Sequence, residues 1–266
     1  MIITDPLQLD FSNYKRFFAF GCSFTQYRWP TWCDIIAHDN PHMEYHNLGK
    51  SGAGNLYIFN QINQHMNKYN LGKGDLVMVL WSSFYREDRY IMKHAWVTPG
   101  NIYSQADYPE EFVDNWCCPR GMTIRDLGLI DAANRLFAHC DFDVTHTLAI
   151  PYDMQTHYSG KSDSIIEEFN LGEVYDLWAH LPQGMHQTLL NCFPDGWKME
   201  YTNIDEQGNQ YTDYHPTVMG YLHYLKALGI NISKATQTWA FGEHQRMLAT
   251  PDAGEIGNAE PVQILE

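Results

Sequence analysis

Two short motifs, far apart in the chain, carry residue types that can perform nucleophilic chemistry together. Gly21-Cys-Ser-Phe-Thr25 places the Ser23 hydroxyl directly after a short apolar run, and Asp213-Tyr-His215-Pro216 supplies a carboxylate and an imidazole. A serine hydroxyl becomes a useful nucleophile when a base removes its proton, and a carboxylate can hold a histidine in the correct tautomer for that task. Ser23, His215 and Asp213 are therefore the candidate nucleophile, base and orienting acid. An ordinary Asx-type helix cap is the alternative interpretation of the Asp213 motif.

A glycine-rich motif, Asn47-Leu-Gly49-Lys-Ser-Gly52, could supply the groups that stabilise a developing negative charge. Glycine lets the backbone come close to a ligand, and its N–H can point at an oxyanion. We expect the N–H groups of Gly52 and Ser23 to form such an oxyanion hole. A plain glycine turn between a strand and a helix is the alternative.

Regularly spaced apolar runs predict the elements that position these motifs. The run Asp75-Leu-Val-Met-Val-Leu-Trp81 is continuous and apolar, as in parallel strands buried on both faces. Further strands are expected at 15–20, 43–49 and 143–150, and helices at 30–38, 56–69, 123–139 and from Pro216 to Leu228, before Gly229. This alternation predicts a three-layer α/β/α sandwich with a mainly parallel, flavodoxin-like sheet. Ser23 and Gly52 then fall near the carboxyl ends of two strands.

Residues 1–248 are expected to form one domain, because α/β domains of this length commonly share one core. Two stretches without a clean period, about 86–118 and 152–212, are interpreted as insertions, the second with a helix near 173–180. The final stretch, 249–266, contains no Lys or Arg and predicts an extended tail.

Composition narrows the classes of partner. The formal net charge is -15, so the chain would repel a phosphate backbone, and we expect no nucleic-acid partner. No signal peptide is evident, and no window approaches the roughly 18 apolar residues that cross a bilayer, which predicts a cytoplasmic protein without a membrane partner. The six cysteines show no framework spacing and are expected to be free thiols.

In type, order and placement the three motifs resemble those of the SGNH hydrolases, also called GDSL esterases or lipases, from about Lys15 to Gly229. The resemblance implies that Ser23 is the nucleophile and that the N–H of Gly52 belongs to the oxyanion hole. It also implies that Asp213 and His215 complete the triad. The activity implied is hydrolysis of small esters, acyl chains or O-acetyl groups on sugars, with no cofactor and no metal.

The chain departs from the family pattern in two places. The family's third block reads G-x-N-D after the third strand, whereas this chain reads Trp81-Ser-Ser-Phe84. Ser82 or Ser83 could donate from nearly the same place, or Asn55 or Arg86 could reach in from neighbouring loops. Asn55, Trp81 and Arg86 are also our candidates for contacts to the substrate. The second departure is a D-x-H spacing where the family usually has D-x-x-H, and it concerns the orienting acid, Asp213, and not the base, His215.

Several alternatives stay open at this stage. Cys22 could act as a thiolate with His215, and the vicinal Cys117-Cys118 could bind metal or respond to oxidation, although buried small side chains are the plainer interpretation. An acyltransferase would use the same residues. A non-catalytic binding module is the main rival, because the Trp-Ser-Ser segment and the tail resemble SGNH-like phage proteins, which would place the chain in a virion or a homo-oligomer through its tail. Sugar-stacking aromatics are candidates in the insertions, namely Trp96, Tyr103, Trp116, Trp178 and Trp197.

Overall fold

The computed structural model describes residues 2–3, 9–92, 95–102, 108–149, 185, 201–204, 210–213 and 215–249. The strands are β1 (Arg16–Gly21), β2 (Glu44–Gly49), β3 (Asp75–Trp81), β4 (Arg89–Ile91), β5 (Ala95–Val97), β6 (Asp143–Leu148), β7 (Tyr201–Ile204) and β8 (Gln210–Asp213). The helices are α1 (Trp32–Asp39), α2 (Asn55–Tyr69), α3 (Glu110–Trp116), α4 (Pro119–Phe137), α9 (Val218–Ala227) and α10 (Lys234–Ala249), with a short 3-10 turn at Phe11–Asn13.

The central sheet has four parallel strands in the order β2-β1-β3-β6. This is the beginning of the flavodoxin-like order, in which the chain winds outward from β1 in one direction and then in the other. The direction reverses between β1 and β3, and ligands of such sheets bind outside the carboxyl ends of the strands at that point. The predicted fold class is confirmed.

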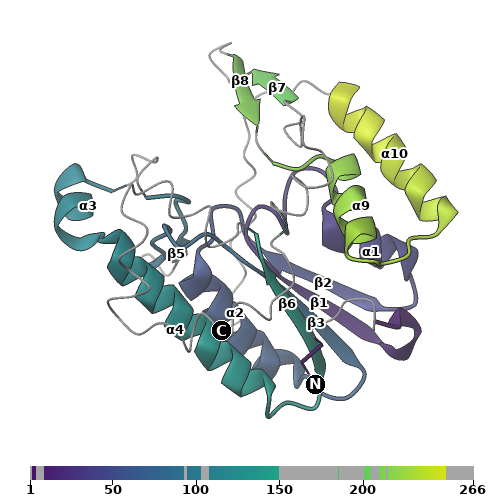
Figure 1. The fold of residues 1–266 in the computed structure, drawn as a ribbon, viewed down its shortest axis with the longest axis horizontal. Coiled ribbons are helices and arrows are strands. Elements are labelled where there is room, and N and C mark those ends of the chain that lie inside the picture. Colours follow the sequence, from purple (N-terminus) through teal and green to yellow (C-terminus); the bar gives the residue numbers. More distant parts are fainter. Residues whose placement is uncertain are drawn as a thin grey trace.

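Helices cover both faces of this sheet (Figure 1). Helices α2 and α4 pack together on one face, and α1, α9 and α10 pack together on the other. All seven residues of β3 are buried, as a central strand covered on both faces requires. The three predicted layers are therefore present, and a single apolar cluster joins the sheet to both helix layers.

The starts of two predicted helices differ from the structure. Helix α4 begins at Pro119, four residues before the expected Thr123, because a proline fits the first helical position without losing a bond. Helix α9 begins at Val218, where the Thr217 hydroxyl accepts a hydrogen bond from the Gly220 N–H and caps the helix. Pro216 lies outside α9, so the prediction that it opens this helix is wrong.

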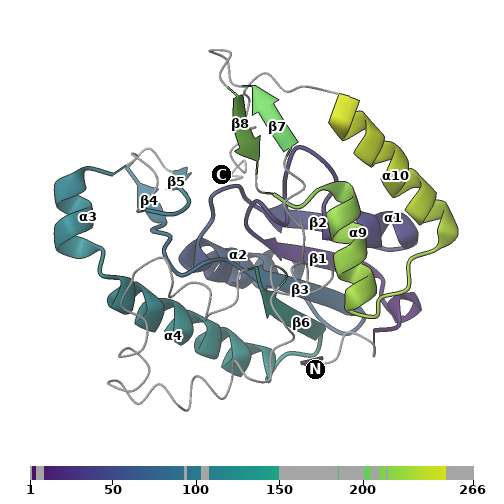
Figure 2. The same cartoon turned by 45° about the horizontal axis from the view of Figure 1, so that its top comes forward.

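The first predicted insertion contains the β4–β5 hairpin and α3, and the second contains the β7–β8 hairpin except for its last residue, Asp213. Both hairpins lie on the upper side of the central sheet in Figure 2. The helix predicted near 173–180, with Trp178 and Trp197, lies outside the described residues, and so do Tyr103 and the tail beyond Ala249.

Helix α10 was not predicted. Its buried residues follow a helical spacing, but two of the four are polar, and the pattern therefore carries little hydrophobic signal. They are Thr236, Ala240, His244 and Met247.

Candidate active site

The loops that carry the sequence motifs begin at neighbouring points of the sheet. The strand register places Gly21 of β1 beside Gly49 of β2, and Phe20 beside Val79 of β3. Ser23, the glycine-rich loop and Ser82 therefore all follow the carboxyl ends of adjacent strands at the switch point. This is the edge at which the fold binds ligands.

A tight turn presents Ser23 at the end of β1. The backbone N–H groups of Thr25 and Gln26 both donate to the Cys22 carbonyl, at 2.9 and 3.1 Å. A side chain on Gly21 would collide with the Thr25 hydroxyl, so the turn needs glycine there. Ser23 is 4% exposed, and the adjacent Cys22 side chain lies in the hydrophobic core. The burial of Cys22 does not favour it as the nucleophile.

His215 lies against this turn and is held by Asp213. Its ring centroid is 5.3 Å from that of Phe24, the residue directly after Ser23. Asp213 Oδ1 accepts hydrogen bonds from His215 Nδ1 at 2.7 Å and from the His215 backbone N–H at 2.9 Å. A carboxylate can only accept, so Nδ1 carries the proton and Nε2 is left as the acceptor.

The short D-x-H spacing is therefore compatible with an orienting carboxylate. Burial raises the pKa of Asp213, but the hydrogen bond and charge of His215, together with the hydroxyl of Tyr27, outweigh it and leave that pKa lowered. The Asp213 side chain is 3% exposed, whereas His215 is 25% exposed and open to solvent on one side.

Among the described residues no hydrogen bond joins Ser23 to His215. Such bonds are often long in ligand-free sites.

The second carboxylate oxygen of Asp213 has partners that the sequence did not indicate. Oδ2 accepts hydrogen bonds from the Tyr27 hydroxyl at 2.6 Å and from Arg28 Nη2 at 2.9 Å. The Tyr27 ring also stacks on the His215 imidazole, with centroids 3.9 Å apart and planes 18° apart. No spacing rule connects residues so distant in the chain, and no sequence signal could have found them.

The loop after β2 presents Gly52 in a conformation that favours glycine, with φ of 72°. In the described part of the chain, the backbone N–H groups of Ser23 and Gly52 donate to no hydrogen bond. Asn47 fixes the start of the loop, because its side chain donates to the Thr25 carbonyl at 2.9 Å and accepts from the Gly49 N–H at 3.1 Å. Both predicted oxyanion donors thus lack an acceptor among the described residues, and both lie just after the carboxyl ends of adjacent strands.

The first insertion braces this glycine loop. Three consecutive residues of the loop contact the segment from β5 to Gly100. The hydrogen bonds are Lys50 Nζ to the Trp96 carbonyl (3.0 Å), Thr98 Oγ1 to the Ser51 carbonyl (3.0 Å) and the Gly100 N–H to the Gly52 carbonyl (3.1 Å). The insertion thus holds the peptide on which the oxyanion hole would depend.

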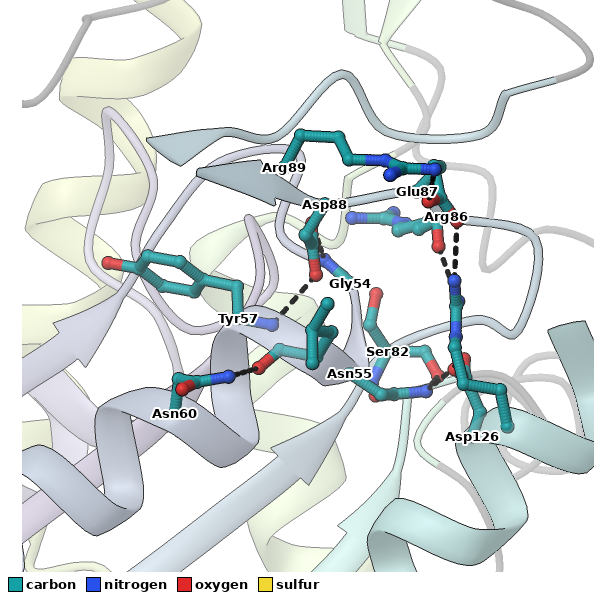
Figure 3. Close-up of polar contacts among 12 residues, drawn as sticks. Gly54, Asn55, Tyr57, Asn60, Ser82, Arg86, Glu87, Asp88, Arg89 and Asp126 are labelled. Atoms are coloured by element: carbon teal, nitrogen blue, oxygen red, sulfur yellow. Dashed lines mark hydrogen bonds and ion pairs between the residues drawn. The ribbon is translucent and has the colours of Figure 1, made fainter. Parts of the chain in front are cut away.

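Asp88 of the same insertion caps helix α2 from outside the helix (Figure 3). Its two oxygens accept from the backbone N–H groups of Gly54 and Tyr57, both at 2.8 Å. Gly54, the residue before the helix, has no side chain to do this. Burial raises the pKa of Asp88 even though these N–H groups lower it. Arg86 adds a bond from Nη1 to the Ala53 carbonyl at 2.9 Å.

Asn55 clamps the loop after β3, where the third family block would lie. Its amide accepts from the Ser82 N–H at 2.8 Å and donates to the Ser82 carbonyl at 3.1 Å and to Asp126 Oδ2 at 2.9 Å (Figure 3). The side chain is fully buried and supports Ser82, and a substrate contact by Asn55 stays a prediction. Burial raises the pKa of Asp126 to about 7 despite its ion pair with Arg125.

The other predicted site residues, at and after the end of β3, differ in burial and in their hydrogen-bond partners. Trp81 is fully buried and donates from its indole to His146 at 3.1 Å, and a substrate contact by Trp81 stays a prediction. Ser83 is 7% exposed, and the Ser82 hydroxyl is buried without a hydrogen-bond partner among the described residues. Ser82 is as fully buried as Asn55 and Trp81, and its role as a third oxyanion donor stays a prediction. A substrate contact by Arg86 stays a prediction.

The alternative chemistries receive no support from the described residues. Within them no group of His, Cys, Asp and Glu side chains could hold a metal ion, and no helix is long and apolar enough to cross a membrane. The five cysteines in this part of the chain are free thiols.

Comparisons with protein-family models and with curated proteins find no match. The chain is similar in structure to a member of the lipolytic G-D-S-L family from Veillonella parvula (13% identity, 80% of this chain, 95% of that chain, TM-score 0.42). It is also similar to a catalytic mutant of an acetylxylan esterase from Geobacillus stearothermophilus (10%, 83%, 96%, TM-score 0.43). A third similar structure is an alpha/beta hydrolase enzyme from the metagenome of Lake Arreo, Spain (13%, 81%, 95%, TM-score 0.44).

The chain is thus a doubly wound α/β protein with a polar site at its topological switch point. With identities this low, its chemistry has to be argued from the site itself.

Proposed function

We propose that this protein is a serine hydrolase of the SGNH type that cleaves ester bonds through Ser23. One observation carries the proposal: His215 packs against the turn that presents Ser23, and Asp213 orients its ring. The two motifs are far apart in the sequence and are brought together by folding. The N–H groups of Ser23 and Gly52, which have no acceptor within the described part of the chain, are the donors proposed for the oxyanion.

The reaction proceeds through an acyl-enzyme. His215 Nε2 accepts the hydroxyl proton of Ser23 while Oγ bonds to the ester carbonyl carbon, and the resulting oxyanion is stabilised by the two N–H groups. The C–O bond to the alcohol then breaks, and His215 returns its proton to the departing alcohol oxygen. Water repeats the sequence and releases the acid. Ser82 is the third donor in this scheme, in place of the absent asparagine.

The substrate class that we propose is a small ester, or an O-acetyl group on a glycan. The support is an aromatic side chain beside the oxyanion loop. Trp96 meets Tyr57 and Tyr90 edge to face, and its carbonyl accepts the bond from Lys50. Aromatic walls with a few placed polar groups are typical of small-molecule sites. Trp116 is 76% exposed on α3, where it covers no part of the described core.

A fluorophosphonate probe tests the proposal directly. Attack of Ser23 Oγ on phosphorus forms an O–P bond and expels fluoride, and the hydroxyl proton passes through His215 to solvent. We expect the label on Ser23, its loss in Ser23→Ala and His215→Ala, and a parallel loss of p-nitrophenyl acetate turnover.

The matched controls are Ser12→Ala and His42→Ala, both at exposed positions. Ser12 precedes β1 and so lies at the opposite end of a strand about 20 Å long. Both controls should keep the label and the turnover.

A folded protein that is neither labelled nor active would contradict the proposal and favour a non-catalytic binding module, for example a virion component. Transfer of the acetyl group to an added alcohol, in preference to water, would identify an acyltransferase.

A further inference from the structure

The Asp213 carboxylate is shared between two sets of donors, one on each oxygen. Oδ1 faces His215, and Oδ2 faces Tyr27 and Arg28 of the loop between β1 and α1. The Asp213 side chain is almost fully buried, so solvent does not screen these contacts strongly. A charge next to Oδ2 therefore interacts electrostatically with the imidazole that is bonded to Oδ1.

The loop that carries Tyr27 and Arg28 is hydrogen-bonded to residues on both sides of His215 in the sequence, Asp213 before it and Pro216 after it. The indole of Trp29 donates to the Pro216 carbonyl at 2.9 Å, just after the histidine. The Arg28 guanidinium lies over the rings of Trp29 and Tyr27, at 4.7 and 5.5 Å from their centroids. The same loop follows the Ser23 turn, so it connects the nucleophile to the base.

We propose that Tyr27 and Arg28 are positioning residues that fix the ring plane of His215 and, through Asp213, set the pH range in which Ser23 is activated. The inference rests on the proposed hydrolase function. Tyr27 acts in two ways, because its ring stacks on the imidazole and its hydroxyl binds the carboxylate. Arg28 acts through its charge, which opposes a second positive charge on the imidazole.

The groups that contact Asp213 and His215 support these different roles of Tyr27 and Arg28. Among the described residues, the titratable or charged groups in contact with Asp213 and His215 are Tyr27 and Arg28, and the other ring contact is the neutral Phe24. Burial raises the pKa of the fully buried Tyr221 well above its usual range, so this phenol is neutral. Arg28 is thus the one positive charge placed on the carboxylate within this part of the chain.

The test is the pH dependence of fluorophosphonate labelling in the full chain. Arg28→Gln removes the positive charge, so His215 takes up a proton more readily, and the lower pH limit of labelling should rise by about one pH unit. Arg28→Lys keeps the charge and should keep the limit near the wild-type position. Tyr27→Phe keeps the stacked ring and should move the limit upward by less. Tyr27→Leu loses the stack as well, and labelling should slow by about tenfold or more at every pH.

Proton NMR titration of the His215 ring follows the same equilibrium without catalysis. The resonance is assigned by its loss in His215→Gln, since the chain has 13 histidines. A midpoint that moves upward in Arg28→Gln but not in Arg28→Lys supports the inference. Equal midpoints in wild type and Arg28→Gln, with intact folding, overturn it. Absence of labelling in the wild type would refute the hydrolase function, whereas the titration would still show whether Arg28 controls the histidine.

Discussion

Replacement of Gly52 by alanine should lower both the stability and the activity of this protein. The residue has φ of 72°, a left-handed conformation that L side chains rarely adopt. An added Cβ would also collide with the Thr98 carbonyl oxygen and lie only 3.0 Å from its carbon and 3.2 Å from the Gly100 nitrogen. Backbone atoms cannot rotate away as a flexible side chain can, so the segment 98–100 must shift.

The expected loss in the free energy of unfolding follows from the interactions that this shift disrupts. A non-glycine residue in the left-handed region costs roughly 1–2 kcal/mol. The shift also weakens two hydrogen bonds of the brace, from Gly100 N to Gly52 and from Thr98 Oγ1 to Ser51, each worth about 1 kcal/mol. We expect a loss of about 3 kcal/mol in the free energy of unfolding. Displacement of one oxyanion donor should lower kcat/KM by about 10²–10³-fold.

Thermal unfolding and p-nitrophenyl acetate hydrolysis measure the two effects. Gly128→Ala is the matched control, because Gly128 is exposed on α4 and an added Cβ there meets nothing within 4 Å. That control should gain about 0.5–1 kcal/mol, since alanine is favoured over glycine in a helix, and should keep full activity. If Gly52→Ala unfolds at the wild-type temperature and keeps kcat/KM within threefold, both the brace and the assignment of the Gly52 N–H are refuted.

Three further substitutions probe the supports of the site. Ser82→Ala should lower kcat/KM by about 10²-fold with an unchanged Tm, because the buried hydroxyl has no described partner to lose; unchanged turnover would exclude it as a donor. Asp88→Ala should cost about 2 kcal/mol in urea unfolding, since the N–H groups of Gly54, just before α2, and of Tyr57, in its first turn, lose their acceptor. Asp131→Ala, which breaks an exposed pair on α4, should cost less than about 0.5 kcal/mol. Equal losses would contradict the capping role. The pKa of Asp126 is raised to about 7, above its unfolded value near 3.9, so its stabilising contribution is present below about pH 4 and lost as the pH rises through 7. Asp126→Asn should remove that decline, so parallel curves of Tm against pH for variant and wild type would count against the shift.

The central sheet and the ends of its strands could be predicted because their signal is local. The run from Asp75 to Trp81 is apolar throughout, and a buried parallel strand needs no other information. Since the carboxyl ends of parallel strands share one edge, the positions of Ser23 and Gly52 followed once the strands were placed. Helix starts were less accurate at Pro119 and Pro216, where the cap is chosen among several residues by the surrounding packing.

Other features depend on contacts between distant segments, which no periodicity encodes. Folding places Asn55, a candidate for a substrate contact, against Ser82 and buries its amide there. Trp81, a second candidate, ends a fully buried strand.

The sequence by itself therefore determined the parallel α/β sheet and the motifs at its carboxyl edge, because hydrophobic runs and turn residues act locally. Only the tertiary structure decided how those motifs are supported. It brought Tyr27 and Arg28 to Asp213, and Asp88 to the start of α2, because the β1–α1 loop and the first insertion fold back across the strand ends. Such contacts are fixed by the packing of the whole chain.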